Sequence, residues 1–474
     1  MAFMLTESFK TLTFPELYRL TGFANAGYEK CKLKLSDSEI KEHQEEISSV
    51  RRLFNILGKL YPVFAVGDIL PNGSYFNGSK ILHPDECDLL LLFKHISLPN
   101  VAISDVDMDN HVKVNIFNEN LKTHINVLKQ SLGVDEKVID DKNNLMENIT
   151  YLLQSAIHTC LSQLEGIHYI GKRQLGPTSS EWDCLNRLRL LHQEDSTSLY
   201  KYIIESRYSY SNDELRDSCR NGTYDPYLSP NTVKLDALIH GPCVRIRVGG
   251  GKYTTDIDLG FCIDNQQTEH GRYIVLPFSN FPFWTQSVYN SKHKLDKHHN
   301  KLLMLLKLLI LECHLVPWSS TYSSHALKTL VLHHQATCTS SERSLGGCLC
   351  DVAHNVFQLY KMKEEDEHLR IYDSRKKLLD VDFLGVDVQP RVAPGGHMDE
   401  NYWVMPLVLY ITIRALRSGC CTGEEALHVD RWLIISELWN NKEGSYVQHY
   451  GLLGQNWKIP IQKIDELITR FYSK

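Results

Sequence analysis

The segment ECDLLLLF, residues 86–93, constrains the fold most, because it sets two carboxylates in an otherwise apolar strand. Residues two apart in a strand point to the same side about 6.5–7 Å apart, so Glu86 and Asp88 face one space. Burying carboxylates is costly unless a partner neutralises them. A hard divalent cation, Mg²⁺ or Mn²⁺, is the natural partner, since it binds carboxylates together with phosphate oxygens. Two such acids on an exposed edge strand are usually solvated, so a metal-dependent phosphoryl-transfer site is expected only in combination with further residues.

A β-hairpin over residues 243–263 supplies candidates for a third carboxylate. In its first strand, CVRIRV, Arg245 and Arg247 alternate with aliphatic residues and share the opposite face. In its return strand, KYTTDIDLGFCI, Asp256 and Asp258 share a face while the large apolar side chains take the other. Either aspartate could complete a cage for a pair of metal ions about 3.5–4 Å apart.

A Gly-Ser turn precedes the acidic strand. Gly73 and Ser74 stand a dozen residues before Glu86. Backbone N–H groups and one hydroxyl in such a turn can contact a triphosphate. The turn and the acids together are much stronger evidence for a phosphoryl-transfer site than either feature alone.

Composition and patterning place these motifs in an ordinary globular chain. The 474 residues carry a net charge of -6 and a pI of about 6.4, so any nucleic-acid binding must use a local patch. The start of the chain has no secretory pattern, and the longest apolar runs are shorter than the ~20 residues of a spanning helix. Thirteen cysteines in no regular array favour a reducing compartment. We expect a cytoplasmic protein, with nuclear access left open.

Helical patterning dominates the remaining sequence. Ser36 and Glu39 form a capping box at the start of a long amphipathic helix, residues 36–60. Residues 105–235 look largely helical, with a turn-rich end at 213–231. Three helices are expected from Asn300 onward: HNKLLMLLKLLILE, SSHALKTLVLHHQ and CDVAHNVFQLYKMKEEDEH. A Pro- and Gly-rich linker, residues 388–400, precedes a last helical segment.

The stretch GSYFNGSKILHPDECDLLLLF resembles the nucleotidyltransferase signature of the cyclic GMP-AMP synthase-like receptors, a family of the male-abnormal type. TTDIDLGF is similar to the family's third-acid strand, and SSHALKTLVLHH and LGGCLCDVAHNVFQLY are similar to its helical lobe. The resemblance covers residues 36–95 and 243–380. It implies an α+β fold, in which a mixed β-sheet core with a long N-terminal spine helix joins an α-helical C-terminal lobe, with the active site in the cleft between them.

The resemblance also implies a division of the chain. Residues 1–270 would form the nucleotidyltransferase core, with a helical insertion at about 105–235. Residues 271–390 would form the helical lobe, and residues 391–474 a C-terminal helical extension.

Site roles follow from the same resemblance, residue by residue. Glu86, Asp88 and Asp256 would be the catalytic metal ligands, with Asp258 beside them hydrated or joining the metal. Gly73 and Ser74 match the triphosphate-holding turn. Lys328 would contact nucleotide phosphates and Tyr372 would stack on a base. Thr285 stands where related synthases often have a base-contacting arginine, which leaves the choice of base open.

The expected reaction joins two nucleoside triphosphates, such as ATP and GTP, into a cyclic dinucleotide with release of pyrophosphate. The product would act on a STING-type receptor in innate immune signalling. Two alternatives stay open: a catalytically silent male-abnormal-type scaffold, and a nucleotidyltransferase that makes linear products.

The activator is expected to be a double-stranded nucleic acid. The segment SKHKLDKHHNK holds four candidate phosphate contacts: Lys292, Lys294, Lys297 and Lys301. No cysteine lies between Cys262 and Cys313, so the zinc thumb of DNA-sensing members is not expected, which favours RNA over DNA. The segment HHQATCTSSERSLGGCLC offers zinc-ligand residues at non-standard spacing, and a solvated or core role is favoured for them: His333, His334, Cys338, Cys348 and Cys350.

Overall fold

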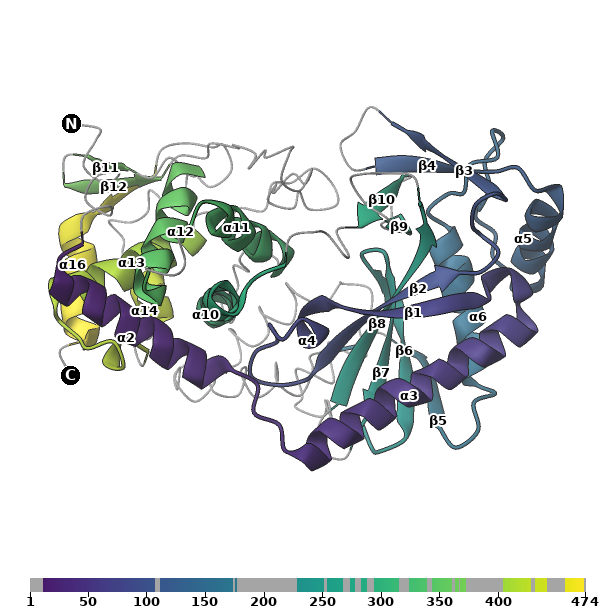
Figure 1. Cartoon of the computed structure of the whole chain (residues 1–474), viewed down its shortest axis with the longest axis horizontal. Helices are drawn as coiled ribbons and strands as arrows, with labels where there is room; N and C mark the ends of the chain where they lie inside the picture. Colours follow the sequence, from purple (N-terminus) through teal and green to yellow (C-terminus); the bar gives the residue numbers. More distant parts are fainter. Residues whose placement is uncertain are drawn as a thin grey trace. The chain divides into compact units, whose positions relative to one another are not determined.

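The protein was analysed as a computed structural model of the whole chain (Figure 1). The structure describes residues 12–106, 111–173, 175–176, 228–250, 254–266, 273–277, 283–287, 294–314, 324–338, 343–359, 363–365, 367–371, 404–427, 431–440 and 457–472. The chain divides into two compact units. The sheet unit comprises residues 33–292, and the helical unit comprises residues 1–32 together with 293–474. Within the described ranges, no helix combines the length and apolarity that crossing a lipid bilayer requires.

A large, mostly antiparallel sheet is the frame of the sheet unit (Figure 1). Its main path runs β3 (Val101–Asp105), β4 (His111–Ile116), β10 (Trp284–Ser287), β9 (Tyr273–Val275), β8 (Thr254–Asp264), β7 (Cys243–Gly249), β6 (Thr232–His240) and β5 (His168–Arg173). Two further strands, β1 (Val66–Asn72) and β2 (Glu86–Phe93), form an antiparallel pair that joins the path through β2 and β8. The expected strand 86–93 and the expected hairpin are therefore both present.

One face of this sheet carries the core. Cys87, Leu89 and Leu91 of β2 are almost fully buried, and so are the alternating aliphatic residues of β7 and β8. They pack in one cluster with apolar residues of two helices, α3 (Asp37–Leu60) and α6 (Ile149–Leu161). Because side chains alternate along a strand, the residues between them point to the opposite face. That opposite face holds the acids.

Helix α3 begins where its capping residues predict. The hydroxyl of Ser36 accepts a hydrogen bond from the backbone N–H of Glu39 at 3.3 Å, and the Glu39 carboxylate accepts one from the backbone N–H of Ser36 at 2.7 Å. The reciprocal pair satisfies donors that the first helical turn leaves free. Val50, Leu53 and Leu57 then recur at helical spacing and are buried against the sheet unit's core.

Helices dominate the other unit. Its long helices are α2 (Phe14–Cys31), α10 (Lys297–His314), α11 (Ser324–Thr337), α12 (Leu345–Leu359), α13 (Val404–Ser418), α14 (Arg431–Asn440) and α16 (Ile461–Tyr472). Helix α2 packs against α10, α12 and α13. The contact with α12 is close at Gly346, where an added Cβ would overlap the backbone of Leu20 and Thr21. An ion pair between Glu16 and Arg417, 2.8 Å long, joins α2 to α13.

A small antiparallel sheet in the helical unit was not expected from the sequence. Its strands are β11 (Lys363–Glu365), β12 (His368–Ile371) and β13 (Trp457–Pro460). The prediction of one helix through CDVAHNVFQLYKMKEEDEH is wrong at its end, since α12 ends at Leu359 and β11 follows. Pairing of β12 with the distant β13 outweighs the local helical preference of this charged segment.

The stretch expected to be largely helical contains strands as well. It holds α5 (Glu119–Ser131) and α6, but also β4, β5 and part of β6. In β4, buried and half-buried residues alternate along HVKVNI, which is the pattern of a strand with one face on a core. Residues 177–227 lie outside the described ranges. The architecture as a whole is mixed α/β, with one large and mostly antiparallel sheet and several helices, in agreement with the α+β prediction.

Candidate active site

Four carboxylates converge on the polar face of two neighbouring strands. Strand β2 runs parallel to β8, and their register pairs Glu86 with Asp256 and Asp88 with Asp258. Paired residues on adjacent strands point to the same side, with backbones about 4.8 Å apart. The structure thus brings together the three acids predicted from the sequence, and Asp258 lies on the same face, as the alternation of the return strand predicted. Asp256 and Asp258 are 2% and 8% exposed, so their charges are largely removed from water.

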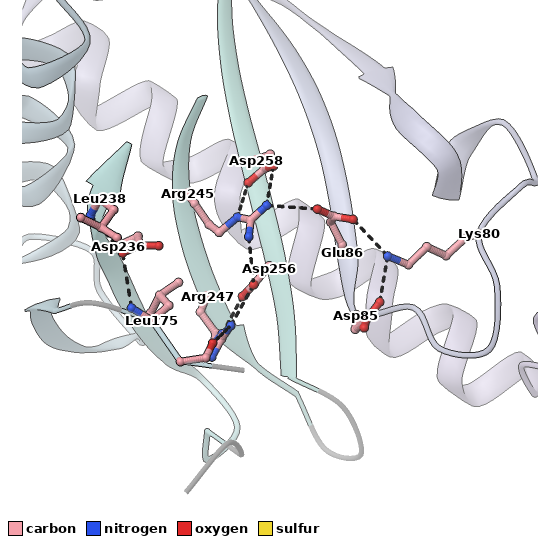
Figure 2. Close-up of polar contacts among 11 residues, drawn as sticks. Lys80, Asp85, Glu86, Leu175, Asp236, Leu238, Arg245, Arg247, Asp256 and Asp258 are labelled. Atoms are coloured by element: carbon pink, nitrogen blue, oxygen red, sulfur yellow. Dashed lines mark hydrogen bonds and ion pairs between the residues drawn. The ribbon is translucent and has the colours of Figure 1, made fainter. Parts of the chain in front are cut away.

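Two arginines on β7 neutralise the aspartates of β8 (Figure 2). Arg247 donates to both carboxylate oxygens of Asp256, through Nε at 2.6 Å and Nη2 at 2.8 Å. Arg245 binds Asp258 in the same two-pronged way, through Nε at 2.6 Å and Nη2 at 2.8 Å. The register of the hairpin explains both pairs, because β7 and β8 align Arg247 with Asp256 and Arg245 with Asp258.

The network extends across β2 to a lysine. Nη2 of Arg245 also lies 3.1 Å from Oε1 of Glu86, while Nζ of Lys80 lies 3.2 Å from Oε2 of Glu86 and 2.8 Å from Oδ1 of Asp85 (Figure 2). Burial alone would lower the pKa of Lys80, but the charges of Asp85 and Glu86 outweigh burial and raise it. Lys80 is therefore a fixed positive charge at the edge of the acid cluster.

Asp88 differs from the other three acids, because it makes no hydrogen bond or ion pair with a cation among the described residues. Burial raises its pKa from 3.8 to about 7, and the nearby negative charges of Glu86 and Asp258 add to the shift. The positive charges of Lys80, Arg245 and Arg247 do not fully offset the negative charges of the carboxylates around Asp88. Asp88 therefore marks the place in the cluster where an additional positive charge would be most stabilising.

Gly73 lies directly against Asp88. It opens the short helix α4 (Gly73–Phe76) with φ of +74°, and an ideal Cβ at this position would overlap the carboxyl group of Asp88. Glycine is thus required twice over, by its backbone conformation and by the close approach of the acid. The first residue of the turn and the acidic strand, separated in sequence, thus lie against each other, and the phosphate-binding role of Gly73 and Ser74 stays a prediction.

The donor set fits a divalent cation in its chemistry. All candidate ligands are carboxylate oxygens, which hard cations such as Mg²⁺ prefer. A carboxylate has about four lone-pair positions, and a two-pronged arginine occupies two of them, so Asp256 and Asp258 keep acceptor capacity. Burial and, after it, the charges of Glu86 and Asp258 raise the pKa of Asp88, and a cation bound beside it would favour its ionised form.

Other predicted residues lie elsewhere. Lys328 is half-buried on α11 in the helical unit, where burial and the charge of Lys294 lower its pKa. Tyr372 and Lys292 lie outside the described residues. Lys294 and Lys297 are exposed, before and at the start of α10, whereas Lys301 places its Nζ 4.9 Å from the centre of the Tyr28 ring.

Thr285 is held in the sheet. It lies on β10, between His111 of β4 and Val275 of β9. Its buried hydroxyl oxygen has no hydrogen-bond partner among the described residues. The expectation that Thr285 stands in place of a base-contacting arginine, which leaves the choice of base open, stays a prediction.

Sequence reasoning missed three residues of this site: Lys80, Arg245 and Arg247 as partners of the acids. The hairpin contained the signal for the two arginines, because their alternation placed them on one face. Pairing them with particular aspartates requires the register of β7 against β8, which the alternation of residues does not contain. No local signal pointed to Lys80.

Comparison with known proteins adds no relative: the chain matches no protein-family model, and no curated protein matches it significantly. The arguments for function therefore come from the residues and the geometry.

We predict that Gly73→Ala destabilises the protein more than Gly133→Ala does. Both glycines have positive φ, +74° and +63°, so both alanines incur the left-handed backbone cost of about 1–2 kcal/mol. Nothing lies within 4 Å of a Cβ at Gly133, whereas at Gly73 the overlap with Asp88 adds about 1–3 kcal/mol. Denaturant unfolding of the two variants measures the difference. Equal losses would show that Asp88 does not crowd the turn.

Asp88 should also make stability depend on pH. Its pKa is raised when folded, so the folded protein holds a proton that the unfolded chain releases between pH 3.8 and about 7. The stability of the wild type should therefore fall, through this group, as pH rises across that window. Asp88→Asn cannot titrate, so its melting temperature relative to wild type should rise between pH 5 and pH 8 in Mg²⁺-free buffer. A constant difference would contradict the shift.

Proposed function

We propose that this protein is a nucleotidyltransferase that joins two nucleoside triphosphates into a cyclic dinucleotide and releases pyrophosphate. The observation that carries the proposal is the parallel register of β2 and β8, which sets Glu86 beside Asp256 and Asp88 beside Asp258. The resemblance of the surrounding sequence to cyclic GMP-AMP synthase-like receptors supports the same reading and suggests a nucleotidyltransferase fold. ATP and GTP are the substrates that the resemblance favours.

The residues would divide the work between metal binding and charge balance. Glu86, Asp88 and Asp256 would hold one or two divalent cations, which when bound would activate a ribose hydroxyl and offset phosphate charge. Both carboxylate oxygens of Asp258 accept hydrogen bonds from Arg245, through Nε and Nη2. This pairing orients the arginine toward Glu86. Arg247 fixes the side chain of Asp256 in the same manner. The carboxylates thus enter the reaction with their positions already set.

The turn beside Asp88 would receive the triphosphate. Ser74 makes no side-chain hydrogen bond with another described residue, so its hydroxyl can turn toward a phosphate oxygen. Gly73 lets the carboxyl group of Asp88 lie directly against the turn, because it carries no side chain. Lys328 and Tyr372 join the proposal through the resemblance, as contacts of phosphate and base.

Double-stranded RNA is the activator we propose, with a cytoplasmic site of action and a STING-type receptor for the product. The described part of the basic segment supports this in a limited way. Lys294 and Lys297 are exposed and can reach phosphates, whereas Lys301 already lies over an aromatic ring. Duplex RNA is read by shape and backbone, which suits a small basic patch.

One observation favours a second candidate, a catalytically silent scaffold. Asp256 is buried and both of its oxygens are bound by Arg247, which also donates to the backbone oxygen of Gly176 at 3.0 Å. Such a pair stabilises a strand interior without any metal. A scaffold would use this network only to hold β7 and β8 together.

An assay that incubates the protein with labelled nucleoside triphosphates, Mg²⁺ or Mn²⁺, and duplex RNA distinguishes the candidate functions. We expect a phosphatase-resistant cyclic dinucleotide, identified by mass spectrometry. Asp88→Asn should reduce its formation at least about 100-fold, because even residues that only orient metal ligands contribute about 10–100-fold. Asp68→Asn, an exposed carboxylate on β1, is the control and should keep full activity. No product with any duplex would support the scaffold, and a ladder of linear products would select a linear-product transferase.

The basic segment gives a separate prediction. Lys294→Glu with Lys297→Glu should weaken duplex RNA binding and reduce the slope of log affinity against log salt by about 1 per lost phosphate contact. Lys94→Glu with Lys142→Glu makes the same charge change at exposed positions of the sheet unit. If both double variants lose affinity equally, the segment has no special role.

A further inference from the structure

A second cluster of metal-ligating side chains lies in the helical unit, apart from the acids. His299 comes from the first turn of α10, His334 from the last turns of α11, Cys338 from the residue after α11, and Cys348 from α12. One ligand atom of each residue lies within 4.8 Å of every other. His299, His334 and Cys348 are 0%, 3% and 0% exposed. Helices α10, α11 and α12, which pack against one another (Figure 1), carry three of these residues, and the half-buried Cys338 directly follows α11.

The two thiols are spaced as in a metal site. Sγ of Cys338 lies 3.7 Å from Sγ of Cys348. A disulfide would need about 2.05 Å. Two thiolates bound to one zinc ion at about 2.3 Å, with a tetrahedral angle between them, lie about 3.8 Å apart. The observed separation matches the shared-metal geometry and not the covalent bond.

His299 and His334 each have one ring nitrogen without a hydrogen-bond partner among the described residues, and that nitrogen could bind a metal. Nδ1 of His299 lies 2.9 Å from Oδ2 of Asp296, while its buried Nε2 has no hydrogen-bond partner among the described residues. Nε2 of His334 is buried and unpartnered in the same sense, and its Nδ1 lies 4.0 Å from Oδ2 of Asp351. A metal-bound histidine almost always binds a carboxylate or carbonyl through its other ring nitrogen. Two orphaned imidazole nitrogens in one buried space are costly unless something binds them.

We propose that His299, His334, Cys338 and Cys348 bind one Zn²⁺ ion in a tetrahedral structural site. Two thiolates with two imidazoles form a donor set of the kind that selects zinc over the hard cations suited to the acid cluster. Because the protein supplies all four ligands, no position stays open for substrate, as is typical of structural zinc. Small side-chain rotations would bring the donors from within 4.8 Å to the spacing of about 3.3–3.8 Å around a bound ion.

Neighbouring residues of the same types help to define the site. His333 and Cys350, which the sequence offered with equal weight, are not in the cluster, because residues one or two apart on a helix do not face the same way. Nε2 of His298 lies 3.3 Å from Sγ of Cys348, a distance suited to a hydrogen bond onto a ligand sulfur. His333 and Cys350 therefore serve as control positions for the ligands His334 and Cys348.

The ion would fasten the start of α10 to α11 and α12. Gln335 already joins the same parts, since its side chain donates to the backbone oxygen of Lys294 at 2.9 Å and accepts from the backbone N–H of Asp296 at 2.9 Å. A zinc site here would fix the segment that carries Lys294 and Lys297. It would do so without an inserted cysteine-rich thumb, and it does not depend on the proposed nucleotidyltransferase activity.

Metal analysis of the full-length protein, purified in reducing buffer, tests the proposal without an activity measurement. We expect about one zinc per chain in wild type, and cobalt substitution should produce the charge-transfer and d–d absorption of a tetrahedral site with thiolate ligands. Wild-type protein that neither contains zinc nor binds added Zn²⁺ or Co²⁺ would overturn the proposal. So would a Cys338–Cys348 disulfide found by mass spectrometry in that buffer.

Paired variants test the assignment of ligands. His334→Gln and Cys348→Ser should lower zinc affinity at least about 100-fold, whereas His333→Gln and Cys350→Ser should keep the ion. Asp296→Asn removes the charge of the carboxylate whose Oδ2 lies 2.9 Å from Nδ1 of His299 and keeps an acceptor oxygen for the backbone N–H of His299. It should weaken binding by about 10–100-fold. Because a ligand variant could fail to fold, the cobalt spectrum of Asp296→Asn gives an independent readout on a protein that keeps all four ligands. Equal loss of zinc in the ligand and control variants would overturn the assignment.

Discussion

Parallel pairing of β2 with β8 is the interaction on which the rest of the sheet unit depends. The register sets four carboxylates on one face, and two of them are almost completely buried. Such a group of charges in a low-dielectric interior is unstable unless cations accompany it. Arg245, Arg247 and Lys80 supply those cations, each within 3.2 Å of a carboxylate oxygen. The hairpin partner of β8 is therefore as much a part of the site as the acids themselves.

The network of acids and basic side chains can serve one of two roles, and the balance of charge within it determines which. A set of fully paired acids stabilises strand contacts, whereas a set with a deficit of positive charge attracts a metal ion. Asp88 is the acid that bears on this difference, since burial and, after it, the acidic neighbours raise its pKa to about 7. Gly73 lies beside this acid, and the carboxyl group of Asp88 occupies the space that a side chain at position 73 would need.

The helical unit contains the opposite kind of chemistry. Its cluster of two imidazoles and two thiols offers softer ligands than the carboxylates of the sheet unit. The two clusters would therefore select different metals from the same solution. The two sites would also act differently. Carboxylates around Mg²⁺ leave positions for substrate, whereas four protein ligands around zinc close the coordination sphere and hold helices together.

The sequence alone determined the local elements: the strand at 86–93, the hairpin that carries Asp256, and the capped helix that starts after Ser36. Each rests on periodicity or on a contact within a few residues, which the chain order contains directly. Tertiary structure decided which side chains meet. The arginine partners of the aspartates depended on register. His299 and His334, which share the candidate metal cluster, lie 35 residues apart in the sequence. Strand β12 pairs with β13 although many residues separate them. Such meetings depend on how helices and strands pack, and spacing along the chain does not encode that packing.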